Sequence, residues 1–141
     1  MRPTRIQVGN GMDVNRSLGI ASIPAALANG FIYTYGITAI SRIDGKVVPG
    51  DIRTQTRTIL DNLESILQAA GSDLEHVVST TVYLRDIEND YAGFNEAYDE
   101  RFASQPTPRT VVQATMRSPD ARVQIQMIAV QARPGTQGEQ Q

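Results

Sequence analysis

The 141-residue sequence has no cysteine, a single histidine, His76, and a single lysine, Lys46. Without cysteine there are no disulfides, thiolate metal ligands or cysteine nucleophiles, which is compatible with the cytoplasm. One histidine is too few for a histidine-based metal site, so we expect no metal. A Ser-His-Asp triad would have to use His76, for which a solvated or capping role is more common. Lys46 follows the turn residues Asp44 and Gly45, which favours an exposed lysine over a Schiff-base lysine.

The net charge is −2 and there is no run of basic residues, so the electrostatic features of a nucleic-acid binder are missing. Neither GxGxxG nor GxxxxGK[ST] occurs, which removes the common nucleotide-binding loops. The most apolar stretch, residues 19–40, is interrupted by Pro24 and Asn29-Gly30 too often to span a membrane, and no signal peptide is recognisable. We therefore expect a cytoplasmic protein without cofactor that binds neither nucleic acid nor membrane.

Apolar residues at three- and four-residue spacing predict a helix over residues 51–70. Ser72 and Glu75 then form the S-x-x-E pattern of a capping box, which predicts a further helical turn. A second helix is predicted over residues 91–102, and residues 86–90 are interpreted as a polar connection before it. The sequence thus predicts two long helices.

Six segments have the composition of β-strands, and Asn29-Gly30 is a strong hairpin signal between two of them. The resulting order, β-β-β-α-β-α-β-β, predicts a single α+β domain over residues 1–132, with two helices on one face of a mixed sheet. Residues 133–141, rich in Pro, Gly and Gln, are predicted to be a disordered tail. The predicted strands cover residues 5–8, 25–28, 31–35, 77–84, 110 onward and 122–132.

The second face of the predicted sheet carries alternate residues such as Thr81, Tyr83, Gln124 and Gln126. This face is half polar, yet a sheet of this size cannot easily leave its whole back open. We therefore predict that subunits pack on that face and that the protein is an oligomer.

Arg109 stands where a late strand begins, with Pro106 and Pro108 just before it. Each proline ring fixes its own φ angle and favours an extended conformation in the preceding residue. A planar guanidinium on such a stiff segment is suited to hold a carboxylate through two parallel hydrogen bonds. The alternative is a surface arginine in a weak salt bridge, and the spacing alone leaves both open.

Several short motifs occur in the same order as these elements, and together they resemble the RidA/YjgF reactive-intermediate deaminase family over roughly residues 25–132. Each motif alone is weak, but the ordered set is specific. The matching segments are FIYTYG at 31–36, DIRTQT at 51–56, DNL at 61–63 with QAAGS at 68–72, VVSTTVYL at 77–84, FNEAY at 94–98 and PRT at 108–110.

The resemblance implies a chorismate-mutase-like α+β fold and a homotrimer with sites in the clefts between subunits. It also implies hydrolysis of enamines and imines to a 2-oxo acid and ammonia without a metal or organic cofactor. Arg109 matches the arginine that holds the substrate carboxylate, and a backbone group near Gly36 would help to orient the reacting group. Asn95 belongs to the same pattern as a candidate substrate-binding residue, with a structural role as the alternative.

Three positions depart from the family pattern. Gln124 stands where the family has a glutamate that positions or activates water, and an amide can orient water but cannot accept its proton at neutral pH. Ser22 falls near the position of a pocket tyrosine. Tyr35 replaces the small residue that precedes Gly36, so the predicted pocket has its aromatic ring on a different wall.

The sequence therefore predicts an imine or enamine deaminase in which Arg109 clamps a carboxylate and Gln124 orients water. The changed pocket favours a bulkier substrate such as an aminomuconate-type acid. The first alternative is a non-catalytic protein that binds or senses carboxylate ligands, because Arg109 is kept while the glutamate is lost. The second is another hydrolase or tautomerase that uses the same cleft.

Overall fold

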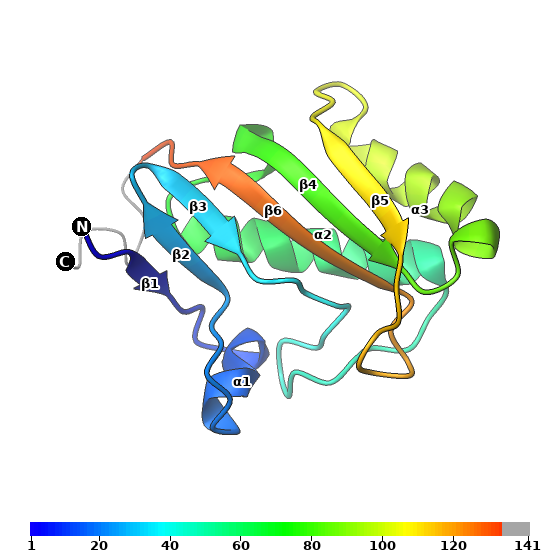
Figure 1. Ribbon diagram of the computed structural model, residues 1–141, viewed down its shortest axis with the longest axis horizontal. Helices are drawn as coiled ribbons and strands as arrows, with labels where there is room; N and C mark the ends of the chain where they lie inside the picture. Colours follow the sequence, from blue (N-terminus) through cyan, green and yellow to red (C-terminus); the bar gives the residue numbers. More distant parts are fainter. Residues whose placement is uncertain (134–141) are drawn as a thin grey trace.

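The computed structural model describes residues 1–133, which form a mixed sheet with helices behind one face (Figure 1). The strands lie in the order β1-β2-β3-β6-β4-β5, in which only β4 and β5 pair in parallel. The predicted α+β class and mixed sheet are thus confirmed. The strands are β1 Thr4–Ile6, β2 Ala25–Ala28, β3 Phe31–Thr34, β4 Val77–Leu84, β5 Arg109–Gln113 and β6 Val123–Val130.

The two long helices are α2, Ile52–Ala69, and α3, Ile87–Phe102, and both lie on the same face of the sheet, as predicted (Figure 1). The short helix α1, Val14–Ser17, follows a 3-10 turn at Gly11–Asp13, and a second 3-10 turn covers Leu74–His76. The short α1, which the sequence pattern did not predict, extends below β2 and contributes to one of the cavities described below.

Helix α2 follows directly from its sequence. The Asp51 side chain accepts a hydrogen bond from the Thr54 N–H at 2.8 Å, which is an N-cap. Ile59, Leu63 and Ile66 are fully buried on the face that meets the sheet. The helix ends before Gly71, whose φ of +84° is a conformation that favours glycine.

Two local predictions are wrong. Helix α3 begins at Ile87, not at residue 91, because Asp86 caps it by accepting a hydrogen bond from the Asn89 N–H at 3.3 Å. The capping box does not form either. The Ser72 hydroxyl donates to the Val130 carbonyl at 2.7 Å instead. The predicted helical turn does follow, as the 3-10 turn Leu74–His76, whose Leu74 N–H donates to the Glu64 carboxylate at 2.8 Å.

The Asn29-Gly30 hairpin is confirmed, since both residues have positive φ angles, 52° and 79°, in the turn between β2 and β3. The predicted disordered tail over residues 133–141 lies, apart from Arg133, outside the described residues. The Arg133 backbone N–H donates to the Gly71 carbonyl at 3.0 Å. No helix within residues 1–133 is long and apolar enough to cross a membrane.

The face of the sheet opposite the helices is not covered by any element of the described chain (Figure 1). Gln124 pairs with Tyr83, and Gln126 pairs with Thr81, as the alternation predicts. Apolar side chains lie among these polar ones with about two fifths of their surface exposed: Phe31 41%, Tyr33 47%, Val112 39% and Val130 39%. We call this surface the open face.

Candidate functional site

Arg109 is the first residue of β5 and lies beside Thr80 of β4, a buried position. Its guanidinium carbon lies 5.0 Å from the centre of the Tyr98 ring and 5.4 Å from that of Phe94. Its Nη2 donates to the Asn95 side-chain oxygen. One turn of α3 therefore supplies both an aromatic support and a hydrogen-bond acceptor that orient this arginine.

The other guanidinium nitrogen of Arg109, Nη1, is buried and has no hydrogen-bond partner among the described residues. Within residues 1–133 the guanidinium forms no ion pair with a carboxylate, so the surface salt bridge left open by the sequence finds no partner there. A buried charged donor without an acceptor is costly, and an incoming carboxylate would remove that cost.

A cavity of about 490 Å³, the arginine cavity, lies beside Arg109. It is bordered by the first turns of α3 and by β5, and its lining residues are Ile87, Glu88, Tyr91, Arg109 and Val111. Burial raises the pKa of Tyr98, whose hydroxyl donates to Thr80 Oγ1 at 2.9 Å, so a neutral ring supports the guanidinium. The lining of the cavity thus combines the apolar side chains of Ile87 and Val111 with the polar groups of Glu88, Tyr91 and Arg109.

A second cavity, of about 650 Å³, brings together three other predicted site residues, Tyr35, Gly36 and Gln124. We call it the glutamine cavity. It is assembled from α1, the segment after β3, the turn at residues 44–47 and the loop before β6. Its remaining lining residues are Val14, Asn15, Leu18, Ile37, Thr38, Ile40, Asp44, Gly45, Lys46, Val47, Arg117, Ser118 and Asp120.

Gln124 and Gly36 are in direct contact in the glutamine cavity. A Cβ atom at position 36 would overlap the Gln124 side-chain amide, so the glycine is required for close approach and not for its φ angle. The Gln124 side chain is half-buried and offers both a donor and an acceptor. It can hold a water molecule beside the Gly36 backbone.

Tyr35 closes the same cavity on the side of α1. Its hydroxyl donates to the Met12 carbonyl at 2.7 Å, which fixes the segment leading into α1. Burial raises the pKa of Tyr35, and the negative charge of Asp13 raises it further, so the phenol stays neutral. Its hydroxyl is engaged with the chain and therefore shapes the cavity rather than supplying a free acid.

The predicted site residues thus fall into two groups within one chain. Arg109 and Asn95 lie at the β5 edge on the helix side, whereas Tyr35, Gly36 and Gln124 line the glutamine cavity. Ser22 lies before β2, donates its N–H to the Ile20 carbonyl, and lines neither cavity.

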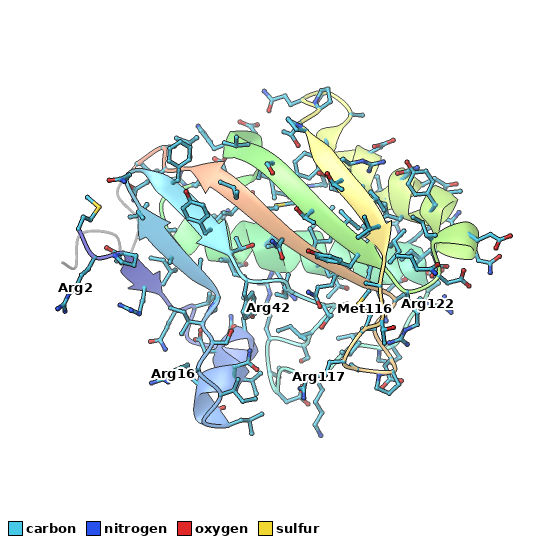
Figure 2. The ribbon with its side chains drawn as sticks, viewed as in Figure 1. Arg2, Arg16, Arg42, Met116, Arg117 and Arg122 are labelled. Carbon is cyan, nitrogen blue, oxygen red and sulfur yellow. The ribbon has the colours of Figure 1, made fainter. Side chains whose placement is uncertain are left out.

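Sequence reasoning missed Lys46 and Arg117 as lining residues of the glutamine cavity (Figure 2 shows Arg117 between the two loops at the lower edge of the sheet). The turn signal at Ser118-Pro119-Asp120, just before Gln124, was the available indication that Arg117 lies nearby. Within residues 1–133 no three His, Asp or Glu side chains gather into a group that could hold a metal ion.

Solved structures with the same fold define the class of protein. A YjgF family protein from Neisseria meningitidis is 32% identical, with a TM-score of 0.69, over 78% of this chain and 87% of that one. Yeast Mmf1, at 24% identity, has the same fold with a TM-score of 0.83 over 92% of this chain and 99% of that one.

Residues 21–131 match the model of the family described as endoribonuclease L-PSP. A RutC family protein of Pyrococcus horikoshii is 39% identical over 105 residues, which are 74% of this chain and 82% of the relative. The mitochondrial protein mmf2 of Schizosaccharomyces pombe is 36% identical over 110 residues, 76% of this chain and 85% of the relative. The chain therefore belongs to the endoribonuclease L-PSP family, which is the RidA/YjgF family that its motifs resemble.

Proposed function

We propose that this protein hydrolyses 2-imino and 2-enamino acids to the 2-oxo acid and ammonia. The observation that carries the proposal is Arg109, a half-buried arginine with one oriented nitrogen and one buried nitrogen without a partner among the described residues. Two adjacent guanidinium nitrogens match the two oxygens of a carboxylate. A small acid held in this way has its reacting carbon, C2, next to the clamp.

In the proposed reaction an enamine first takes a proton at C3 and becomes the protonated imine. Water then adds to C2, and the proton that it releases passes to the nitrogen. The resulting carbinolamine expels ammonia as its hydroxyl loses a proton and becomes the carbonyl of the 2-oxo acid. Gln124 orients the water but does not accept a proton from it, so the nitrogen of the protonated imine provides the driving force. Rate acceleration then comes from positioning and electrostatics.

We further propose that the complete site lies between subunits of a homotrimer, as the resemblance implies. The two cavities hold complementary parts, the carboxylate clamp in one and the water-orienting amide in the other. The open face, with Tyr33 and Phe31 partly exposed, is a suitable surface for another subunit. A β5 edge that meets the glutamine cavity of a neighbour would bring Arg109 and Gln124 together. A cytoplasmic location stays a prediction of the sequence.

The main alternative is a protein that binds carboxylate ligands without turnover, which the replacement of the glutamate by Gln124 favours. Ribonuclease activity, named in the description of the family, has less support in this chain. The net charge is −2, and the single histidine pairs with Asp73 at 2.6 Å, outside both cavities.

The decisive experiment measures ammonia and 2-oxo acid release from 2-aminoacrylate and 2-iminobutyrate, generated in situ by a dehydratase. Wild type is compared with Arg109→Ala and with Arg101→Ala, a control that removes an arginine of α3 in an exposed ion pair with Asp61. We expect wild type and the control to accelerate hydrolysis and Arg109→Ala to lose the acceleration.

If wild type gives no acceleration with either substrate, these two imines are not its substrates, and 2-oxobutyrate binding by calorimetry then tests the alternative. Binding that Arg109→Ala abolishes would establish a ligand-binding protein. Equal acceleration by wild type and Arg109→Ala would remove the carboxylate clamp from the proposal. Gln124→Glu reports separately on whether water activation limits the rate.

A further inference from the structure

The glutamine cavity has two walls that come from irregular segments about seventy residues apart. One wall is the turn at residues 44–47 and the other is the loop at residues 117–120. Each wall brings one cation and one carboxylate to the cavity: Asp44 and Lys46 from the first, and Arg117 and Asp120 from the second. The distance between the walls therefore decides which polar groups fit between these charges.

Gln55 connects the two walls. It lies in α2, is 1% exposed, and comes from none of the segments that carry the predicted site residues. Its Nε2 donates to the Val48 carbonyl at 3.2 Å, next to the first wall, and to the Asp120 carbonyl at 2.9 Å, in the second. One buried amide group thus holds both segments through their backbones.

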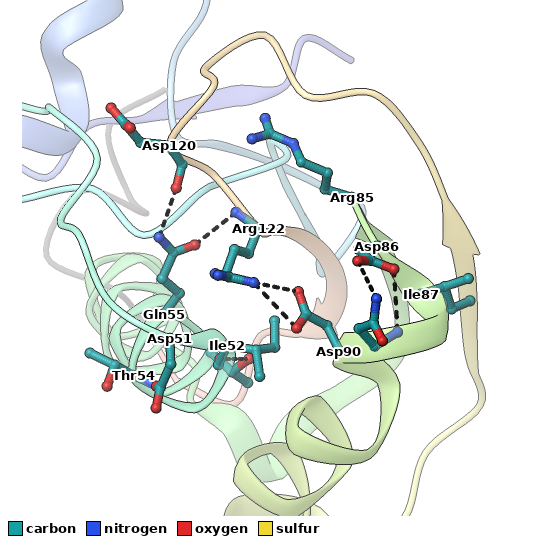
Figure 3. Close-up of polar contacts among 12 residues, drawn as sticks. Asp51, Ile52, Thr54, Gln55, Arg85, Asp86, Ile87, Asp90, Asp120 and Arg122 are labelled. Carbon is teal, nitrogen blue, oxygen red and sulfur yellow. Dashed lines mark hydrogen bonds and ion pairs between the residues drawn. The ribbon is translucent and has the colours of Figure 1, made fainter.

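The same amide also fixes the start of β6. Gln55 Oε1 accepts the Arg122 backbone N–H at 2.8 Å, two residues before Gln124 (Figure 3). Because a planar amide has a fixed angle between its oxygen and nitrogen, the three contacts set the wall spacing and the entry of β6 together.

Other side chains brace the second wall. Arg85 donates to the carbonyls of Ser118 and Pro119, and the Arg122 guanidinium pairs with the buried carboxylate of Asp90 at 3.1 Å (Figure 3). These contacts tie the loop at residues 118–122 to β4 and α3. Gln55 links this loop to Val48, the residue that follows the turn at residues 44–47.

We propose that Gln55 is a positioning residue that sets the spacing of the glutamine cavity and thereby selects substrates by their distal group. The inference rests on the proposed function. A 2-imino acid with a polar or charged group beyond C3 reaches between the walls and depends on their spacing. A short apolar 2-imino acid does not reach them, and its hydrolysis depends on Arg109 and Gln124 alone.

The test compares kcat/KM for 2-iminoglutarate, which has a distal carboxylate, with that for 2-iminobutyrate, which has none. Both are generated by amino acid oxidases with catalase present. The variants are Gln55→Leu, which loses all three hydrogen bonds, and Gln55→Glu, which keeps the acceptor for Arg122 and loses both donations. The control is Gln131→Leu, since Gln131 donates to the Ala70 carbonyl, beyond the opposite end of β6.

We expect the ratio of the two kcat/KM values to change about tenfold in both Gln55 variants and to stay at the wild-type value in the control. A lower melting temperature is expected in Gln55→Leu and in the control, so stability loss alone does not explain a changed ratio. An unchanged ratio in both Gln55 variants would overturn the proposal.

Binding of 2-oxobutyrate and 2-oxoglutarate, measured by calorimetry on the same proteins, separates this inference from the proposed function. Wild type that hydrolyses neither imine but binds the two oxo acids with a ratio altered by Gln55→Glu would refute the deaminase proposal and support the role of Gln55. Wild type that neither hydrolyses nor discriminates between these ligands would refute both.

Discussion

At the scale of single residues, the contact between Gly36 and Gln124 gives the sharpest prediction. Gly36→Ala places a Cβ atom against the Gln124 amide and must displace it. We expect kcat on imines to fall about tenfold or more while KM changes little, because Arg109, which holds the carboxylate, lies elsewhere. Steady-state kinetics on the purified variant measures both values.

Gly30→Ala is the matched control for this substitution. Gly30 has a φ of +79° and open space where a Cβ atom would lie, so alanine there strains only the backbone of a hairpin turn. It should cost about 1 kcal/mol of stability and leave turnover unchanged. A loss of activity in Gly30→Ala equal to that in Gly36→Ala would show that the kinetic effect comes from general destabilisation.

Tyr35 provides a pH-dependent prediction at the same scale. Tyr35→Phe removes the hydrogen bond to the Met12 carbonyl and should lower the free energy of unfolding by about 1 kcal/mol at pH 7. Burial raises the pKa of Tyr35 in the folded state, so its contribution is complete below the ordinary tyrosine pKa of about 10 and declines above it. Urea unfolding of both proteins between pH 7 and 11 should show the difference shrinking at alkaline pH.

At the scale of elements, two ion pairs join α2 to α3. Arg53 pairs with Glu96 and Arg57 with Glu100, each at 2.7 Å. The hydrogen bonds from these arginines hold the pKa of both carboxyl groups below the usual value. Their contribution to stability is therefore present above pH of about 4.3 and is lost as the pH falls through the lowered folded-state values.

The variant with both Glu96→Gln and Glu100→Gln should consequently melt below wild type at pH 7 and together with it at pH 3. Circular dichroism melts at the two pH values measure this. Since both pairs are exposed, added salt should also reduce the difference at pH 7. A difference that persists unchanged at pH 3 would mean that the glutamates act through packing and not through charge.

The elements also show what a sequence can and cannot predict. Helix α2 was predicted at both ends because its cap at Asp51 and its stop at Gly71 are local signals. The first turn of α3 was missed because residues 86–90 are mostly polar, although Asp86 caps the helix locally, and the burial of Asp90 beside Arg122, 32 residues away, is not visible in that segment. The capping-box prediction at Ser72 failed because the Ser72 hydroxyl donates to a strand 58 residues further on, which the local sequence does not show.

The candidate site likewise contains residues that the sequence indicated and contacts that only the structure shows. Arg109, Gly36 and Gln124 were proposed because each lies in a segment that resembles a known family or departs from its pattern. The bond from Arg109 to Asn95 and the place of Arg117 beside Gln124 depend on how segments cross in space. Gln55 lies in the DIRTQT motif, but the motif does not show that all three of its side-chain bonds reach the backbone of other segments.

At the scale of the whole molecule, the open face predicts self-association. Tyr33 is 47% exposed at the centre of β3, and Tyr33→Arg would place a charge on the proposed subunit contact. We expect this variant to be monomeric by analytical ultracentrifugation and inactive on imines, since its cavities would no longer meet. Ile43→Arg, at a 93% exposed position in a turn, should remain oligomeric and active. Full activity in a monomeric Tyr33→Arg would show that one chain holds a complete site.

The separation of Arg109 from Gln124 has a genetic consequence. If each site takes its arginine from one subunit and its glutamine cavity from the next, two impaired variants can complement each other. Arg109→Ala and Gly36→Ala, unfolded and refolded together in equal amounts, would form mixed rings, and each mixed trimer would contain one intact pair of half-sites. With random assembly, about a quarter of wild-type activity should return, whereas two variants of the same half-site should never rescue one another.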